Sequence, residues 1–131
     1  AHTLKAMGIE TIPTGYMLVD GGKPTTVSYV GQTLPIPRDN PGIAACTALA
    51  GEMLGLRTIY MDTGSGAEFT VSPEMIAAVR NSVDLPIIIG GGIRDAKTAR
   101  ALCTAGADVL VIGTAFEEDP ERIFEMREAV A

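Results

Sequence analysis

The residues of this chain that are best suited to chemistry are a tyrosine and a carboxylate on one short strand. They are Tyr60 and Asp62, in the stretch TIYMDTGSGA at residues 58–67. Alternation along a strand places both on one face and the apolar Met61 on the other. A phenol and a carboxylate side by side can bind hydroxyl groups, and the carboxylate can accept a proton from one of them. We therefore expect the polar face to line a site for a hydroxylated ligand.

Three strand ends in the chain carry glycine. The turns are Gly64-Ser65-Gly66, Gly90-Gly91-Gly92 and Gly113-Thr114. Glycine lacks a Cβ, so its backbone can take a positive φ and approach a ligand closely. Backbone N–H groups that converge in this way suit phosphate oxygens, although tight turns alone would also call for glycine. Because the last two loops follow consecutive strands and join the Gly-Ser-Gly turn, we favour a phosphate site.

Several residues near these turns have a second interpretation that the sequence leaves open. Asp62 could cap a neighbouring turn, and Ser65 could either hold its turn or bind phosphate through its hydroxyl. Arg94, which follows GGGI, is expected at the rim or in an ion pair rather than on a ligand. Tyr16 and Asp20 share the inner face of an earlier strand, where core filling and rim solvation are the expected roles.

The composition excludes several classes of protein. The chain has 131 residues and is 47% hydrophobic but only 5% aromatic, which suits the small aliphatic core of an α/β protein. A formal net charge of −6 with scattered basic residues argues against a nucleic-acid surface. Cys46 and Cys103 are expected to be buried, reduced thiols, and with His2 as the one histidine we expect neither thiol catalysis nor zinc. No apolar run approaches the ~18 residues of a membrane span, so we expect a cytoplasmic protein.

The elements that must position these residues alternate between strands and helices. Strands are expected over residues 15–20, 57–62, 86–90 and 108–113, the last two buried on both faces. Helix starts are indicated at Asn40-Pro41, Ser72-Pro73, Asp95 and Asp119-Pro120. A first helix should end at Gly8, and residues 25–38 should form an irregular insertion over one rim, with a short strand or an extended excursion at 25–29.

Helical periodicity predicts which side chains of these helices face the core. The first long helix is expected to bury Ile43, Cys46, Ala50 and Leu54. The following helices are expected to bury Met75, Ile76, Val79 and Val83, then Ala99, Leu102 and Cys103, and finally Ile123, Met126 and Val130.

Strands and helices that alternate with short loops require a parallel sheet with right-handed crossovers. Four such units fit half of an eight-stranded barrel or a small open sheet, and either needs cover at both sheet edges. In a barrel, the loops after the strands form the catalytic face and the last two strands commonly supply a phosphate site. The loops at 90–92 and 113–114 would fall at those two places.

Three motifs occur in this chain in a specific order and spacing. They are YMDTGSGA at 60–67, LPIIIGGGIRD at 85–95 and GADVLVIGTAFEED at 106–119. Together with the upstream runs ETIPTGYMLVDGG and AACTALAGEMLGLRTIY, they resemble the geranylgeranylglyceryl phosphate synthase family of archaeal prenyltransferases over essentially the whole chain. The resemblance implies a (βα)8 TIM barrel that joins geranylgeranyl diphosphate to the C3 hydroxyl of sn-glycerol 1-phosphate in ether-lipid biosynthesis, with Mg²⁺ holding the diphosphate.

The resemblance also assigns roles to residues of the three glycine loops. It implies a glycerol phosphate site made of Tyr60, Met61, Asp62, Thr63, Gly64, Ser65, Gly66, Gly91, Gly92, Gly113 and Thr114. Asp62 is the catalytic candidate, as the base that accepts the proton of the C3 hydroxyl. Family members typically have Glu at this position, which is one methylene longer. The Mg²⁺ ligands of the family lie at the first two strands of its barrel, so no metal ligand is expected in this chain.

The length of the chain departs from the family, whose barrel has about twice as many residues. We therefore expect residues 1–131 to be the C-terminal half of a single barrel domain, made of its last four β/α units. The chain begins without Met in the middle of an expected helix, as it would if other residues preceded it. On this view an N-terminal half is a partner, the chain is inactive alone, and open sheet edges favour a homo-oligomer.

Three alternatives stay open at this point. The first is a prenyltransferase of the same family that uses a longer donor. The second is a phosphosugar isomerase or cyclase barrel, which has similar glycine loops but which the YMDTGSGA strand disfavours. The third is a half-barrel module that binds a phosphorylated ligand without chemistry.

Overall fold

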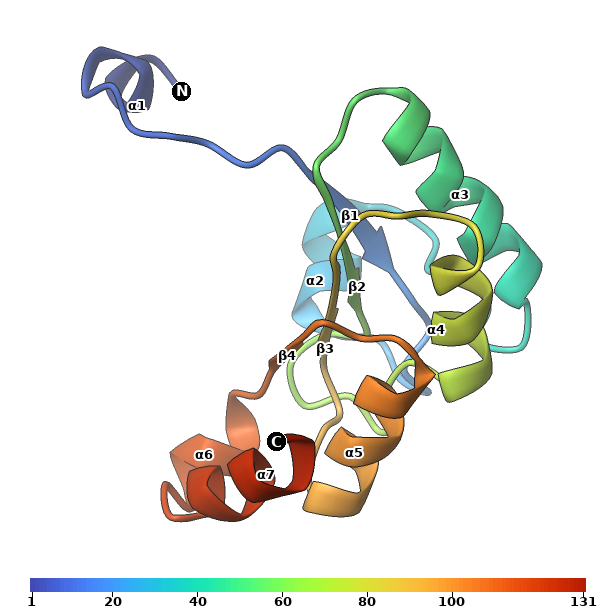
Figure 1. Cartoon of the computed structure of the whole chain (residues 1–131), viewed down its shortest axis with the longest axis vertical. Coiled ribbons are helices and arrows are strands. Elements are labelled where there is room, and N and C mark those ends of the chain that lie inside the picture. The colour runs from blue at the N-terminus through green and yellow to red at the C-terminus, as the bar shows by residue number, and fades with distance from the viewer.

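The structure is a computed structural model that describes all residues from 1 to 131. Four parallel strands form one sheet in the order of the sequence, as Figure 1 shows. They are β1 (Thr14–Leu18), β2 (Thr58–Asp62), β3 (Ile87–Gly90) and β4 (Val109–Val111). Because the strands are parallel, their carboxyl ends and the loops that follow them meet at one edge of the sheet.

The long helices cover one face of this sheet (Figure 1). They are α3 (Pro41–Met53), α4 (Pro73–Arg80) and α5 (Ala96–Ala105), each placed between consecutive strands. The short helix α6 (Thr114–Glu118) and the last helix α7 (Arg122–Val130) follow β4. At the other end of the chain, α1 (His2–Ala6) lies away from the sheet beyond an extended segment (Figure 1). None of these helices has the length and apolar character needed to cross a membrane.

Three helix starts follow the predicted capping pattern. The side chain of Asn40 accepts a hydrogen bond from Ile43 N at 3.3 Å, and Ser72 accepts one from Met75 N at 3.2 Å. Asp95 accepts one from Thr98 N at 2.8 Å, and this bond holds the pKa of the Asp95 carboxyl below its usual value. These side chains satisfy N–H groups that have no partner within the helix. The last helix begins later than predicted, because α7 starts at Arg122 rather than at Asp119-Pro120.

The core lies between the sheet and the covering helices. Ile59 and Met61 of β2 and Ile87 and Ile89 of β3 are at most 1% exposed, while their neighbours along each strand face the other way. Burial of Met75, Ile76, Val79 and Val83, and of Ala99 and Leu102, confirms the predicted inner faces of α4 and α5. The alternation predicted for residues 58–62 is therefore confirmed, and it turns Tyr60 and Asp62 away from the helices.

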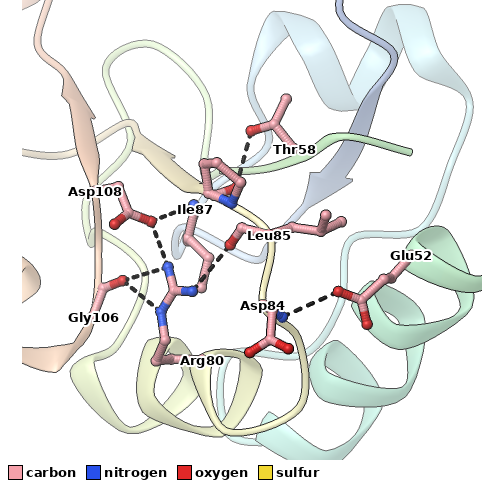
Figure 2. A network of polar contacts seen from close by, with 9 residues as sticks. Glu52, Thr58, Arg80, Asp84, Leu85, Ile87, Gly106 and Asp108 are labelled. Carbon is pink, nitrogen blue, oxygen red and sulfur yellow. Dashed lines mark hydrogen bonds and ion pairs between the residues drawn. The ribbon is translucent and has the colours of Figure 1, made fainter. Parts of the chain in front are cut away.

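A polar network ties the elements together at the amino ends of β3 and β4 (Figure 2). The guanidinium of Arg80 donates to Gly106 O at 3.2 and 3.1 Å and to Leu85 O at 3.0 Å. It also pairs with Asp108, whose Oδ2 accepts a hydrogen bond from Ile87 N at 2.8 Å. The network joins the end of α4 to the starts of β3 and β4, at the opposite end of these strands from the glycine loops.

The prediction of a strand or an extended excursion at residues 25–29 is wrong, because Thr26–Gly31 form helix α2. Thr25 N donates to Ser28 Oγ at 2.9 Å, and Ser28 Oγ donates to Thr25 O at 2.7 Å. These local bonds at the helix start outweigh the extended preference of the β-branched residues. The segment then returns beside β1, where Ile36 pairs with Val19.

The buried face predicted for α3 is also wrong. Its buried residues are Ala44, Ala48 and Gly51, whereas Ile43, Cys46, Ala50 and Leu54 are exposed. Small residues on the inner face let the helix approach its neighbours closely, and a Cβ at Gly51 would stand 3.1 Å from Leu56 Cδ1. Cys46 is therefore not a buried thiol; Cys103 is partly buried, which raises the pKa of its thiol, and nearby Asp108 raises it further.

The prediction that residues 108–113 are buried on both faces is wrong as well. Val109 and Val111 are 47% and 45% exposed, because β4 is an edge strand and nothing covers its inner face. The inner face predicted for the last helix is only partly correct. In α7, Met126 is buried while Ile123 and Val130 are exposed, since α7 packs mainly on α5.

Candidate functional site

The carboxyl ends of β2, β3 and β4 surround a cavity of ≈ 230 Å³. The three glycine turns converge on it, as their positions at successive strand ends predicted. Its walls include eight residues that the sequence singled out: Tyr60, Asp62, Ser65, Gly66, Gly91, Gly92, Gly113 and Thr114. Their roles as ligand contacts stay a prediction, but their convergence on one cavity is a feature of the fold.

The other three predicted site residues do not line this cavity. The side chain of Met61 lies in the core with 0% exposure. Thr63 is 1% exposed and lines a separate pocket beside the loop that follows β1. Gly64 is packed against Thr25, where an added Cβ would stand 2.3 Å from Thr25 Oγ1. These residues shape the loop behind the cavity wall.

Both carboxylate oxygens of Asp62 are held by hydrogen bonds. Oδ1 accepts from Gly64 N at 2.8 Å, and Oδ2 accepts from the hydroxyl of Tyr16 at 2.5 Å. One oxygen of Asp62 therefore caps the neighbouring turn, as one interpretation predicted, and the other is bound by Tyr16 of β1. Asp62 is 8% exposed and lines the cavity, so a group bound there would meet this fixed carboxylate.

Tyr16 is a neighbour of Asp62 that the sequence did not assign to the site. Strand alternation placed it on an inner face, but core filling was the expected role. The parallel register pairs Tyr16 with Tyr60 and Leu18 with Asp62, so the phenol reaches diagonally across to the carboxylate. The rings of Tyr16 and Tyr60 meet edge to face, with centroids 5.3 Å apart and an interplanar angle of 86°. Knowledge of the register of β1 against β2 would have predicted the contact between Tyr16 and Asp62.

The two phenols beside Asp62 stay neutral over the physiological range. Tyr16 is 48% exposed, but the partial burial of its phenol raises its pKa, and the hydrogen bond and negative charge of Asp62 raise that pKa further. The pKa of Tyr60 is raised by burial and then by the same charge. A neutral phenol can donate its O–H as well as accept, so Tyr60 can offer a donor to a ligand in the cavity.

Close packing and positive φ angles explain why residues 90–92, at the end of β3 and in the loop after it, are glycines. A Cβ at Gly90 would stand 2.5 Å from the hydroxyl oxygen of Tyr60. Gly91 and Gly92 have φ of +86° and +69°, and added Cβ atoms would meet Thr63 Oγ1 at 2.3 Å and the backbone of Phe69 at 2.7 Å. The tight-turn interpretation therefore accounts for Gly91 and Gly92 on its own.

Gly113 is different, because the chain does not require glycine there. Its φ is −98°, a value that any residue can adopt, and an added Cβ would meet nothing closer than Glu117 at 3.8 Å. It nevertheless belongs to the cavity wall. The absence of a side chain leaves its backbone open at the point where a ligand would approach.

Arg94 carries the one cationic side chain among the residues that line the cavity. Its Nη2 donates to Ala67 O at 2.9 Å, so it joins the loop after β3 to the loop after β2. Arg94 therefore lies at the rim, as predicted, and it also lines the cavity. Apolar residues that the sequence did not single out complete the wall: Val27, Ala67, Ile93, Val111 and Ile112. Val27 belongs to α2, so the segment 25–38 does lie over the rim.

No group of three or more His, Cys, Asp or Glu side chains is placed to hold a metal ion. The cavity combines backbone from three glycine turns, one arginine, a fixed carboxylate and a neutral phenol. Such a set suits a small ligand with an anionic group at one end and a hydroxyl group at the other.

Comparison with known proteins gives relatives along the whole chain. A family model described as the PcrB family matches residues 1–130. Geranylgeranylglyceryl phosphate synthase of Chitinophaga pinensis is 53% identical over 130 residues, which make up 99% of this chain and 52% of the relative. The protein of the same name from Thermococcus gammatolerans is 52% identical over 118 residues, 90% of this chain and 46% of the relative. The chain spans about half the length of the curated relatives it matches.

A solved structure shows the same arrangement of elements. It is the crystal structure of (S)-3-O-geranylgeranylglyceryl phosphate synthase from Thermoplasma acidophilum in complex with its substrate sn-glycerol-1-phosphate. The TM-score is 0.93 at 39% sequence identity, covering 99% of this chain and 53% of that one. The four parallel strands and their helices thus match half of a TIM barrel, which confirms the predicted fold class over the open-sheet alternative.

Proposed function

Because this chain belongs to the PcrB family, we propose that it supplies the glycerol phosphate site of a prenyltransferase. The reaction joins geranylgeranyl diphosphate to the C3 hydroxyl of sn-glycerol 1-phosphate. Two findings on relatives support this: curated relatives carry the name of that synthase, and the Thermoplasma acidophilum structure holds that substrate.

The observation that carries the proposal is the cavity where three glycine turns meet Asp62 and Tyr60. The phosphate would lie against the backbone of Gly66, Gly92 and Gly113, with Ser65 and Thr114 as hydroxyl donors. Gly113 supports this placement most directly, because neither its φ nor a neighbour accounts for glycine there. The glycerol hydroxyls would then extend toward Asp62 and the phenol of Tyr60.

The chemistry in this proposal uses Asp62 as the proton acceptor. The allylic diphosphate ionises as the bond from its C1 to the diphosphate oxygen breaks, and the diphosphate leaves with the electron pair. The C3 oxygen of the glycerol phosphate forms the new ether bond to C1, and its proton passes to the carboxylate of Asp62. Two hydrogen bonds already fix that carboxylate, so little reorganisation is needed at the moment of transfer.

The Mg²⁺ that the family implies would hold the diphosphate and promote its departure. The side chains of this chain do not form a site for it, since no group of three or more potential ligands comes together. We therefore place its ligands outside residues 1–131 and assign no step of the ion to these residues.

The remainder of the barrel is the partner that this fold calls for. Val109 and Val111 face an uncovered side of the sheet, and β4 has no neighbour on its outer edge. We propose that residues 1–131 are the C-terminal half of the barrel and that an N-terminal half supplies the missing strands. The closed barrel would act as a homo-oligomer, and this chain alone would be inactive.

The test is to close the barrel and measure ether formation. The chain is co-produced with the N-terminal half of the Chitinophaga pinensis relative and incubated with sn-glycerol 1-phosphate, labelled geranylgeranyl diphosphate and Mg²⁺. The relative divided at the matching point is the positive control, and this chain alone is the negative control. We expect labelled ether from the first two samples only.

Other outcomes of this test contradict the proposal in different ways. Glycerol phosphate binding without ether, while the divided relative is active, would make the chain a binding module. Faster turnover with a longer prenyl diphosphate would keep the site but change the donor. Ether from the chain alone would remove the claim that a second half is required.

A further inference from the structure

The hydroxyl of Tyr16 donates a 2.5 Å hydrogen bond to Oδ2 of Asp62, although Tyr16 itself does not line the cavity. We infer that Tyr16 is a positioning residue, which holds the Asp62 carboxylate in the orientation that accepts the substrate proton. The inference rests on the proposed function and goes beyond it, because it assigns a role to a residue outside the substrate site.

The geometry of the carboxylate shows what the phenol adds. The terminal torsion of an Asp side chain has a broad energy profile, so one hydrogen bond leaves the carboxylate free to turn. Gly64 N holds Oδ1 at 2.8 Å, and the Tyr16 hydroxyl holds Oδ2 from the neighbouring strand. Two donors on two oxygens fix the plane of the group. Each oxygen keeps a second lone pair, so an acceptor site for a substrate hydroxyl remains.

Tyr16 is itself held in place by the sheet. Its backbone pairs with Tyr60 in the parallel register, and its ring packs edge to face against the Tyr60 ring at 5.3 Å. Aromatic pairs with this geometry are favourable, so the phenol has a preferred orientation before substrate binds. The hydroxyl then reaches two residues along the strand, to the level of Asp62.

No other side chain donates a hydrogen bond to this carboxylate. The titratable or charged groups around it are Tyr16 on β1, Tyr60 on β2 and Arg94 after β3, while β4 and α2 each contribute a valine to the cavity. Arg94 is bound to Ala67 O, and the Tyr60 hydroxyl lies above Gly90. The orientation of Asp62 on the β1 side therefore depends on Tyr16.

The test is a double-mutant cycle in the closed barrel, with Tyr16→Phe, Asp62→Asn and the two combined. Tyr16→Phe keeps the ring and removes only the hydroxyl. We expect kcat to fall about tenfold, with the KM for sn-glycerol 1-phosphate within about threefold of the parent value, as loss of one bond to a charged group would give. In the Asp62→Asn background the same change should alter kcat by less than about twofold, because Tyr16 acts through Asp62.

The split between kcat and KM is a second readout that a purely structural role would not give. A loss of packing around Tyr16 would lower the melting temperature and weaken substrate binding, whereas loss of the bond to Asp62 should lower kcat at an unchanged KM and an unchanged melting temperature. This readout also decides the matter if Asp62→Asn is too slow to measure. Tyr29→Phe is the matched control. It also removes one phenolic hydroxyl, but from a side chain on α2 that is 85% exposed. Thermal melting of each variant checks that the barrel is intact.

The outcomes separate this inference from the proposed function. An inactive parent barrel, beside an active divided relative, would remove both. An active parent in which Tyr16→Phe keeps full kcat would remove the inference alone. So would an equal loss of kcat in both backgrounds, or a rise in KM with kcat unchanged, since either would mean that Tyr16 acts without Asp62.

Discussion

Gly90 lies directly against the hydroxyl of Tyr60, so that a Cβ at position 90 would stand 2.5 Å from the phenol oxygen and 2.9 Å from Cε2 of the ring. The last residue of β3 thus decides where the side chain from the middle of β2 can lie. The Tyr60 ring is also the surface on which Tyr16 packs. Room at one backbone position therefore sets the placement of both phenols beside Asp62.

Gly90→Ala should displace Tyr60 and weaken the site. Overpacking of this kind costs about 1–3 kcal/mol of unfolding free energy, and the displaced phenol should lower affinity for sn-glycerol 1-phosphate. Calorimetric titration and chemical denaturation of the closed barrel measure the two effects. Gly42→Ala is the control, because its Cβ would meet only Asn40 Oδ1 at 3.6 Å. Unchanged affinity in Gly90→Ala would show that Tyr60 is not needed where it lies.

Gly113→Ala should separate ligand approach from loop geometry. Its φ of −98° suits alanine and the added Cβ meets no close neighbour, so the unfolding free energy should change by less than about 0.5 kcal/mol. Affinity for sn-glycerol 1-phosphate should nevertheless fall about tenfold or more, because the methyl group would occupy the approach to the backbone. Titration calorimetry and melting give both numbers.

Gly92→Ala is the companion variant with the opposite expectation. At φ of +69° an added Cβ would stand 2.7 Å from the backbone of Phe69, so stability should fall by more than 1 kcal/mol, on the order seen for strained backbone positions. If Gly113→Ala instead lost stability and kept its affinity, the phosphate site at that turn would be wrong.

Arg80→Met should destabilise the fold without touching the cavity. The change removes the donors to Gly106 O and Leu85 O and leaves Asp108 without its ion pair (Figure 2). With the Arg80 side chain 30% exposed, we expect a loss of about 2 kcal/mol in the free energy of unfolding. Denaturant unfolding measures this loss, and ligand affinity of the folded protein should be unchanged.

Arg57→Met is the matched control for that experiment. Arg57 pairs with Glu10 at 3.8 Å, with side chains 61% and 80% exposed. Exposed pairs of this kind contribute little, so the expected change is below about 0.5 kcal/mol. Equal losses in the two variants would mean that the network of Figure 2 adds nothing beyond a surface ion pair.

Alkaline pH should destabilise the protein through Tyr16, which is 48% exposed, and the partly buried Tyr60. The pKa values of Tyr16 and Tyr60 lie above their ordinary value of 10.0 in the folded state, so folding favours the protonated phenols. Their contribution to stability is complete below pH 10 and is lost as the pH rises from there toward the folded-state pKa values. Absorbance of tyrosinate against pH measures the ionisation, and denaturant unfolding at each pH measures the stability.

Asp62→Asn is the variant that isolates the cause of this shift. It removes the negative charge that raises both pKa values, so tyrosine ionisation should begin at lower pH than in the parent. An unchanged titration curve would mean that burial alone holds the phenols neutral.

Features that depend on neighbours in sequence were predictable. The Ser72-Pro73 start of α4 and the alternation through Tyr60 and Asp62 follow from capping chemistry and from the geometry of a strand. The convergence of the glycine turns followed from the parallel order of strands, since parallel strands end at the same edge.

The features that sequence reasoning missed depend on tertiary packing. The choice of Ala44 and Ala48 over Ile43 as the inner face of α3 is decided by how closely the helix approaches the sheet. Tyr16 and Asp62 are 46 residues apart, and only the register of β1 against β2 brings them together. The exposure of Val109 follows from its place on an edge strand, which hydrophobicity alone does not reveal.

The outer edge of β4 has a consequence for how such a chain can be made in a cell. A row of unpaired backbone groups beside Val109 and Val111 is a template onto which another strand can add. The matching half of a barrel would pair with the backbone groups of that edge. A second copy of this chain would instead begin a series of strand additions that ends in aggregation. The strand is only three residues long and the protein carries a net charge of −6, and both features slow such self-addition while a closing partner forms.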